Sequence, residues 1–370
     1  MTRIGIVGAG QLGRMLALSA APLGVSTLFL DRSADTPAGR IAPILVGEFT
    51  DRKLLRKLAA RSNVVSFDWE NVSVEALRAA TRGTRARIAP SLRALAIAQD
   101  RLLEKRLFES LQIPTTDYAA VDSLPALRRA VARIGCPGVL KTRRFGYDGK
   151  GQYVVQRETD IAAAWAALGS APLLYENRVP FACEVSAIAV RGRDGAMAFY
   201  PLNRNFHDGG ILRLTLAPWK KPALERAAFH AIRKVMQHLS YVGVLAIEFF
   251  VRGGKLIANE MAPRVHNSGH WTIEGAATSQ FENHIRAIAG LPLGVTTARG
   301  HSALINLIGT MPADRRCLEL PDVHLHDYCK SPRAGRKVGH LTIVSANTAA
   351  RDALAHNLVN SLYPRLRGMF

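Results

Sequence analysis

The first hundred residues alternate short apolar segments with amphipathic ones, and this alternation constrains the fold more than any other feature of the sequence. Apolar strands are expected at residues 4–7, 25–30, 44–49 and 64–69, with helical spacing of apolar side chains between them. Strands that alternate with helices favour a parallel sheet covered on both faces. Because 370 residues exceed what one hydrophobic core usually supports, two or three domains are expected.

The glycines after the first strand form a second signal. Gly8, Gly10 and Gly13 match a GxGxxG turn that opens a helix, and Asp31 ends the next strand, where a ribose-binding acid would lie. Taken alone, this pattern suggests a dinucleotide-binding oxidoreductase. Backbone amides at a helix N-terminus bind any phosphate, so the turn predicts a phosphate site and does not single out NAD.

Beyond residue 98, strands and helices no longer alternate regularly. This change indicates α+β domains after the N-terminal α/β domain. Helices are expected at 99–111, 123–135, 222–239 and, more weakly, 349–360. Strands are expected at 138–142, within 173–203, and at 244–251, 255–260, 303–308, 324–328 and 340–345, while 261–275 is irregular and polar.

A glycine-rich loop follows the strand at 138–142. Its sequence is GYDGKGQ at residues 146–152, and closely spaced glycines let a backbone fold over a phosphate chain while Lys150 adds charge. The spacing is not that of a Walker loop, and a mobile surface hairpin is the alternative. Lys141 ends an apolar strand and therefore needs an anionic partner, a role that a nucleotide phosphate would fill.

Two glutamates stand inside apolar strands of the next region. Glu248 lies within VLAIEFFV and Glu260 ends LIANE, beside Asn259. A carboxylate in such a strand is costly unless it is paired or binds a metal, and oxygen ligands suit magnesium. A pair of ion-paired structural glutamates is the alternative.

The length of the turn between these strands decides whether Glu248 and Glu260 can bind the same metal ion. A two-residue turn at Gly253-Gly254 pairs Glu248 with Asn259, which leaves Glu260 on the opposite face. Both carboxylates face one side only if the turn has an odd length or a strand carries a bulge. We therefore predict one of these irregularities.

Two further polar segments are candidates for binding anions. In the segment 264–275, Arg264 lies close to the acidic strand end and could reach a reacting anion. His266 and His270 have a zinc-like spacing, but the Asn-Ser-Gly between them is poor helix material and disfavours zinc. The basic segment 328–340 fits a phosphate monoester or a solvated turn equally well.

Composition narrows the class of protein. Lys and Arg number 49 against 29 Asp and Glu, a formal charge of +20 that would attract nucleic acid, acidic lipid or phosphorylated metabolites. The basic residues are scattered, so a nucleic-acid-binding protein stays only as an alternative. The four cysteines have no metal or disulfide spacing, and neither a secretory signal nor an apolar stretch long enough to span a bilayer is recognisable. We expect a cytoplasmic protein without a membrane or nucleic-acid partner.

Together, the motifs resemble those of the 5-(carboxyamino)imidazole ribonucleotide synthase family, a purine-biosynthesis branch of the ATP-grasp superfamily. The resemblance covers residues 4–344 and is strongest in GQLGRML (10–16), QDRLLEK (99–105), GYDGKGQ (146–152), APRVHNSGHWTIEG (262–275) and GRKVGH (335–340). Phe145 and Val265 depart from it, since glycine and proline are expected there. The tail after residue 346 matches nothing in the family pattern.

The resemblance implies an ATP-grasp fold in four parts. These are an N-terminal Rossmann-like domain (1–98), a lid subdomain (99–172), a core with the metal site (173–298) and a C-terminal mixed domain (299–370). It implies carboxylation of aminoimidazole ribonucleotide by bicarbonate through carboxyphosphate, with ATP and Mg²⁺, or alternatively Mn²⁺, in a homodimer. Another ATP-grasp ligase acting on a phosphorylated amine is the alternative.

The resemblance also implies roles for individual residues. The nucleotide is expected at Arg101, Lys141, Gly146, Tyr147, Asp148, Gly149, Lys150, Gly151, Gln152, Glu176, Asn177, Arg178, Val179, Glu184, His207, Asn259 and Glu260. The metal is expected at Glu248 and Glu260. The ribonucleotide is expected at Gln11, Leu12, Glu70, Asn267, Lys330, Arg336 and Lys337, and the catalytic groups are Asp148, Arg264 and His266.

Overall fold

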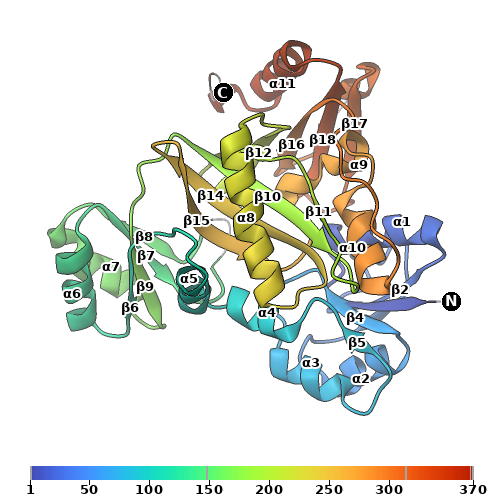
Figure 1. Cartoon of the computed structure of the whole chain (residues 1–370), viewed down its shortest axis with the longest axis horizontal. Coiled ribbons are helices and arrows are strands. Elements are labelled where there is room, and N and C mark those ends of the chain that lie inside the picture. The colour runs from blue at the N-terminus through green and yellow to red at the C-terminus, as the bar shows by residue number, and fades with distance from the viewer. Residues whose placement is uncertain (1, 147–148, 313–314, 367, 369–370) are drawn as a thin grey trace.

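The computed structural model describes residues 2–146, 149–312, 315–366 and 368, and three β-sheets organise them (Figure 1). The N-terminal sheet is parallel, in the order β3-β2-β1-β4-β5. Its strands are β1 (Arg3–Val7), β2 (Ser26–Asp31), β3 (Ile44–Val46), β4 (Val64–Phe67) and β5 (Arg87–Ile88). Its helices are α1 (Gln11–Ala20), α2 (Arg52–Ala60), α3 (Val74–Thr81) and α4 (Leu92–Ala98). The predicted parallel sheet is confirmed, although β3 and β4 end before the expected limits.

A small sheet stands apart at one side of the molecule (Figure 1). Its order is β6-β9-β7-β8, with β6 (Tyr118–Val121), β7 (Gly138–Thr142), β8 (Gln152–Val155) and β9 (Leu173–Asn177). Helices α6 (Leu124–Ile134) and α7 (Ile161–Leu168) pack on it and close a separate apolar core. Because β9 pairs with β7, this sheet extends beyond residue 172, where the lid subdomain was expected to end.

The central sheet has nine strands, eight of them in the order β15-β14-β10-β12-β13-β16-β18-β17, with β11 paired to β10. They are β10 (Cys183–Arg191), β11 (Met197–Phe199), β12 (Asn203–Asp208), β13 (Ile211–Ala217), β14 (Gly243–Arg252), β15 (Lys255–Ala262), β16 (His301–Ile308), β17 (Val323–Asp327) and β18 (Lys337–Ser345). The three last strands join this sheet directly, so the C-terminal part continues the core's own hydrogen-bond ladder.

Helices cover both faces of the central sheet. They are α5 (Arg101–Ser110), α8 (Pro222–His238), α9 (Thr272–Gly275), α10 (Gln280–Ala289) and α11 (Thr348–Leu362). Single 3₁₀ turns are η1 (Ala21–Leu23), η2 (Glu158–Asp160), η3 (Asn267–Gly269), η4 (Arg316–Glu319) and η5 (Pro364–Leu366). Helix α5 begins later than expected because the Asp100 carboxylate accepts the Leu102 N–H at 2.9 Å and caps it.

The hairpin β14–β15 contains the predicted irregularity. Arg252 pairs with Lys255 across a two-residue turn, but the register shifts after Phe249, so that Glu248 pairs with Glu260. Asn259 is the extra residue of this bulge, and both carboxylates face the same side of the sheet. The predicted bulge is confirmed.

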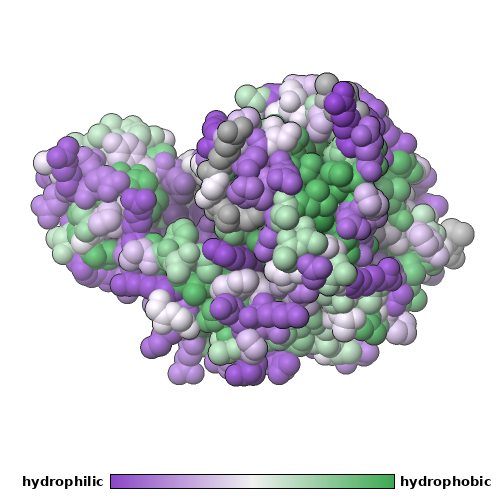
Figure 2. Space-filling view, turned by 90° about the horizontal axis from the view of Figure 1, so that it is seen from above, coloured by the Kyte–Doolittle hydropathy of each residue, from purple (hydrophilic) through white to green (hydrophobic). Residues whose placement is uncertain are grey.

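Seen from above, the smaller lobe is set off from the larger one, and most of its visible surface is hydrophilic (Figure 2). Among the described residues, no helix is long and apolar enough to cross a membrane.

Candidate active site

The two paired glutamates form the centre of the candidate site. The Arg101 guanidinium donates to Glu260 Oε2 at 2.9 Å, and His266 Nε2 lies 3.4 Å from Glu248 Oε1. Burial raises the pKa of Glu248 to about 7, with His207 opposing and Glu260 adding to the shift. Two carboxylates held this close repel each other, and a cation between them would relieve that repulsion.

Oxygen atoms dominate this corner. Within the described ranges, no three or more His, Cys, Asp or Glu side chains are grouped as a metal site. The carboxylate pair is joined by Asn259, whose Oδ1 is buried without a hydrogen-bond partner. An unsatisfied buried oxygen next to a carboxylate pair fits a hard divalent cation.

Helix α5 holds the bulge in place from the open edge of the sheet. Lys105 Nζ donates to the Asn259 carbonyl at 2.9 Å, and Glu104 Oε1 accepts the Met261 N–H at 2.6 Å. Both side chains are buried. Neither residue was expected in the site, although both lie in the QDRLLEK motif, because the sequence does not reveal that their side chains are buried.

The anionic partner of Lys141 is Glu176. Lys141 Nζ lies 3.0 Å from Glu176 Oε1, and Lys105 Nζ lies 3.1 Å from Glu176 Oε2, which also accepts from Thr116 at 2.6 Å. Burial alone would raise the pKa of Glu176, but the two lysines hold it well below its usual range. Glu176 is therefore the anionic partner of Lys141 within the protein, and a nucleotide phosphate would be a second anion for the same ammonium.

The glycine-rich loop returns over the end of β7. Gly149 and Gly151 have positive φ values of 77° and 70°, and a Cβ on Gly151 would lie 2.6 Å from Thr142 Oγ1. A Cβ on Gly146 would lie 3.4 Å from the Arg101 guanidinium, so the loop approaches the acidic corner. Gln152 pairs with Lys141. Tyr147 and Asp148 lie outside the described residues.

The remaining expected nucleotide residues lie on β9, in its connection to β10, and on β10 and β12. Asn177 ends β9, and its Oδ1 accepts the Asp117 N–H at 3.0 Å. Arg178 and the buried Val179 follow in the connection to β10. Glu184 Oε2 lies 2.8 Å from His207 Nδ1, so these two side chains form a pair on neighbouring strands β10 and β12.

A second group of side chains lies where the N-terminal sheet meets the central sheet. Lys330 Nζ donates to Gln11 Oε1 at 2.5 Å, and Arg264 Nη2 lies 2.5 Å from Glu70 Oε1. Burial, and then the neighbouring Arg336 guanidinium, lower the pKa of Lys330 to about 8. A cation that burial disfavours in this way is stabilised by an incoming anion.

The polar segment after β15 connects the two groups. His266 contacts Glu248, as described above, and burial followed by the Arg264 charge lowers its pKa to about 3. The adjacent Asn267 donates to Asn306 Oδ1 at 3.2 Å. Arg336 donates to the Ser331 side chain at 2.8 Å in the basic segment. Two expected ribonucleotide residues complete the set: Lys337, which begins β18, and Leu12, which is buried in α1.

The glycine turn before α1 does not offer its amides as predicted. The N–H groups of Gly10 and Gly13 both donate to Asp68 Oδ2 at 3.0 Å, and Asp31 accepts from the Ala9 N–H at 2.7 Å. The Asp68 carboxylate therefore takes two of the amides on which a phosphate was expected, and a phosphate at this turn would need other donors. Burial raises the pKa of Asp68 to about 6.

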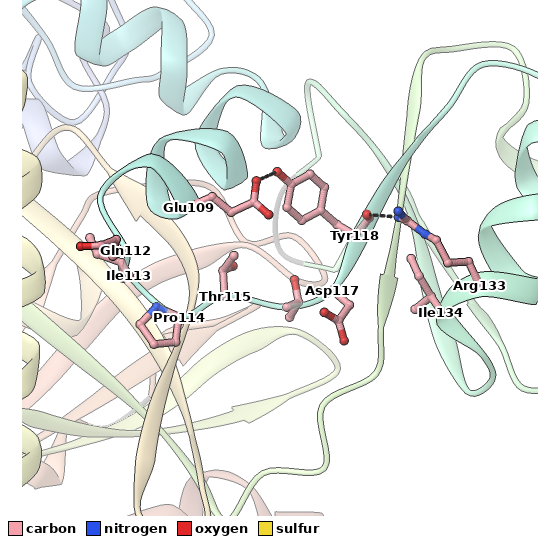
Figure 3. A pocket seen from close by; sticks show the side chains of 10 residues that line it. Glu109, Gln112, Ile113, Pro114, Thr115, Asp117, Tyr118, Arg133 and Ile134 are labelled. Carbon is pink, nitrogen blue, oxygen red and sulfur yellow. Dashed lines mark hydrogen bonds between the residues drawn. The ribbon is translucent and has the colours of Figure 1, made fainter.

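A pocket of about 640 Å³ lies outside this site, where α5 leads into β6 (Figure 3). Tyr118 donates its hydroxyl to Glu109, and Arg133 donates to the Tyr118 carbonyl at 2.6 Å. None of the predicted site residues lines it. The pocket marks the junction between the small sheet and the rest of the chain.

The parallel N-terminal sheet, the small sheet and the acidic corner together define a ligase of the ATP-grasp class. The ATP-grasp domain model matches residues 106–281, the ribonucleotide synthetase preATP-grasp domain model matches 1–99, and the phosphoribosylaminoimidazole carboxylase C-terminal domain model matches 302–353. The N5-carboxyaminoimidazole ribonucleotide synthase of Pseudomonas aeruginosa is 49% identical over 95% of this chain and 97% of its own length. The chain belongs to the N5-carboxyaminoimidazole ribonucleotide synthase family.

Solved structures agree with this assignment. The N5-carboxyaminoimidazole ribonucleotide synthetase of Thermus thermophilus is similar with a TM-score of 0.92 and 49% identity, covering 97% of this chain and 98% of its own. The Aspergillus clavatus synthase in complex with ADP and 5-aminoimidazole ribonucleotide has a TM-score of 0.91 and 29% identity, with 98% of each chain covered.

Proposed function

We propose that the chain carboxylates 5-aminoimidazole ribonucleotide with bicarbonate and ATP, and so produces N5-carboxyaminoimidazole ribonucleotide, ADP and phosphate for purine biosynthesis. One observation carries this proposal: His266 contacts Glu248 of the acidic corner, and Arg264, two residues before it, pairs with Glu70 in the second group of side chains. A phosphoryl-transfer corner and a candidate ribonucleotide pocket are thus adjacent. The Aspergillus clavatus relative binds both ADP and this ribonucleotide.

The reaction needs two steps. A bicarbonate oxygen attacks the γ-phosphorus of ATP, and ADP leaves, which forms carboxyphosphate. The amine of the ribonucleotide then attacks the carboxyphosphate carbon, phosphate leaves, and a proton is lost from the nitrogen. Lys141, Lys150 and Arg101 hold the polyphosphate, and Arg264 stabilises the reacting anion. Carboxyphosphate hydrolyses readily, so the 146–152 loop serves to exclude water.

Magnesium fits the acidic corner. Glu248 and Glu260 face the same side, and Asn259, which precedes Glu260 in the bulge, has a buried Oδ1 without a hydrogen-bond partner. When bound there, Mg²⁺ would offset charge on the phosphoryl groups, and Mn²⁺ accepts the same oxygen ligands. Arg101 and His266, which now contact the two carboxylates, would then share them with the cation.

The other assignments from the sequence belong to the same proposal. Asp148, Arg264 and His266 act in catalysis, and Lys330, Arg336 and Lys337 bind the ribonucleotide phosphate through charge-assisted hydrogen bonds. A cytoplasmic location, a homodimer and the four domain limits, with the lid subdomain extended to residue 177, complete it. An NAD-dependent oxidoreductase is disfavoured, because Asp68 occupies the amides that a pyrophosphate would need.

Phosphate release from ATP tests the proposal. With magnesium and bicarbonate present, we expect release to be slow without ribonucleotide and strongly stimulated by 5-aminoimidazole ribonucleotide. The product should appear in step with phosphate. Equal stimulation by a different phosphorylated amine would reassign the chain to another ATP-grasp ligase, and no stimulation by either compound would reject the proposed substrate.

A further inference from the structure

The segment that follows helix α11 contacts the end of strand β16, next to the basic segment that carries Arg336. The C-terminal domain model ends at residue 353, and the tail after residue 346 matches nothing in the family pattern. Helix α11 packs on the apolar face of β16 and β18 and ends at Leu362. The next residue is Tyr363. Its hydroxyl accepts the Ile308 N–H at 2.9 Å and donates to the Asn306 carbonyl at 2.6 Å.

These two hydrogen bonds lie at an irregularity of the central sheet. The register between β16 and β18 shifts between Leu307 and Ile308, so that Ile308 pairs with Lys337. A bulge disrupts the ladder locally, and the Tyr363 hydroxyl fills the gap by bonding the backbone on both sides of Leu307. The tail therefore fixes the end of β16 where Lys337 begins the neighbouring strand.

The basic segment is hydrogen-bonded to Gly309, the residue that follows strand β16. The Gly309 N–H donates to the Arg336 carbonyl at 2.8 Å, and the Gly309 carbonyl accepts the Arg333 N–H at 3.0 Å. A displacement of the 306–309 backbone would thus move the loop that carries Arg336. It would also move Asn306, whose side chain accepts from Asn267.

The tyrosine ring is itself held by charged groups. The Arg213 guanidinium lies 5.1 Å from the Tyr363 ring centroid and pairs with Asp208 at 3.1 Å, and Arg365 reaches the same carboxylate at 3.2 Å. A cavity of about 870 Å³ borders these residues and Gly335 of the basic segment. Tyr363 thus combines packing against the apolar core of β16 and β18 with a cation–π contact, while open space adjoins the basic segment.

We propose that the Tyr363 hydroxyl is a positioning group for the basic loop, and that it sets the affinity for the phosphate of the ribonucleotide. It acts through Ile308 and Gly309 on Arg336 and Lys337 and touches no substrate. The inference rests on the proposed function, because it concerns the same pocket.

Tyr363→Phe tests the inference, since it removes only the hydroxyl and keeps the ring. We expect the KM for 5-aminoimidazole ribonucleotide to rise about five- to tenfold, the scale of one lost hydrogen-bonding group. The KM for ATP and the kcat at saturating ribonucleotide should stay unchanged. With 5-aminoimidazole riboside, which lacks the phosphate, the variant and the unmodified protein should have the same KM.

Tyr200→Phe is the matched control. The buried Tyr200 hydroxyl also makes two hydrogen bonds, to the Thr278 carbonyl at 3.0 Å and from Asn283 at 2.8 Å, but none to the basic segment. Tyr200→Phe should lower the stability of the fold about as much as Tyr363→Phe does, without changing the KM for the ribonucleotide.

Three results would overturn the inference: an unchanged ribonucleotide KM in Tyr363→Phe, an equal rise in the KM for ATP, or an equal penalty with the riboside. The last two outcomes would indicate a role in general stability only. If the unmodified protein itself shows no ribonucleotide-stimulated phosphate release, the proposed function fails, and this is observed before any variant is made.

Discussion

Lys330 shows how burial and charge combine in a single residue. Its ammonium is largely removed from water and bonds Gln11 from the first turn of α1. The charged groups that face it are the cations Arg333, Arg336 and Lys337 and the carboxylate Asp68, and burial together with the cations outweighs the carboxylate. The result is a lysine whose pKa of about 8 lies within the range of an enzyme assay.

This pKa predicts how binding depends on pH. Below pH 8, Lys330 is charged in the free protein and attracts the ribonucleotide phosphate. Above pH 8 it must first take up a proton, so the KM for the ribonucleotide should rise, by at most about tenfold per pH unit. Steady-state rates between pH 7 and 9.5 measure this, with the KM for ATP as an internal reference.

Lys330→Arg provides the control, because a guanidinium stays charged over this range. Its ribonucleotide KM should be nearly independent of pH between 7 and 9.5. A flat profile in the unmodified protein, or an unchanged slope in the arginine variant, would remove Lys330 as the titrating group.

At the scale of elements, the pairing of α5 with the edge strand β15 decides where the acidic corner lies. The bulge at Asn259 brings Glu248 and Glu260 together, and an edge strand with a bulge has unpaired backbone groups. Glu104 and Lys105 satisfy these groups from α5. Lys105 also contacts Glu176 of the small sheet, so one helix connects the corner to both sheets.

Lys105→Met should therefore be strongly destabilising. It leaves the Asn259 carbonyl without its buried donor and removes one of the two lysines that compensate Glu176. Loss of one partner of a buried ion pair costs about 3–5 kcal/mol of the free energy of unfolding, which urea titration measures.

Lys234→Met serves as the comparison. Lys234 is half-buried and makes one hydrogen bond, to the Leu111 carbonyl at 3.0 Å. Loss of this hydrogen bond should lower the free energy of unfolding by less than about half of the decrease expected for Lys105→Met. Similar losses in the two variants would mean that the Lys105 contacts add nothing specific to the fold.

At the scale of the whole molecule, the small sheet is a separate lobe with its own apolar core (Figure 1). It approaches the central sheet through the glycine-rich loop, where a Cβ on Gly149 would lie 3.0 Å from the Gly209 carbonyl of the β12–β13 turn. The net charge of +20 is a property of the whole chain, and a positive field of this kind attracts polyanions.

Nucleotide binding should protect the loop from hydrogen exchange. Gly149 and Lys150 are exposed, and the Gly151 carbonyl accepts the Thr142 N–H at 2.8 Å. With ADP and magnesium, we expect slower exchange in peptides covering 149–155, because phosphates would bind the loop. Peptides from the buried strand β16 should not change. Equal exchange of 149–155 with and without nucleotide would argue against a lid.

Much of the fold followed from local periodicity. Apolar runs separated by amphipathic segments predicted the parallel sheet, because side-chain spacing reports which face of an element is buried. The need for a bulge followed from the alternation of side chains along a strand. Across a regular two-residue turn, Glu248 and Glu260 would lie on opposite faces. The motifs then predicted the family, which the comparisons confirm, and the residues proposed for the candidate site.

The tertiary structure alone decided which charged groups meet. Asp68 fills the turn at Gly10, Lys105 holds the bulge at Asn259, and Lys330 bonds Gln11, and each of these contacts joins residues far apart in the chain. Local patterns report only which side of an element is buried. The partners of a buried polar group depend on how separate sheets and helices meet, and that is set by the packing of the whole chain.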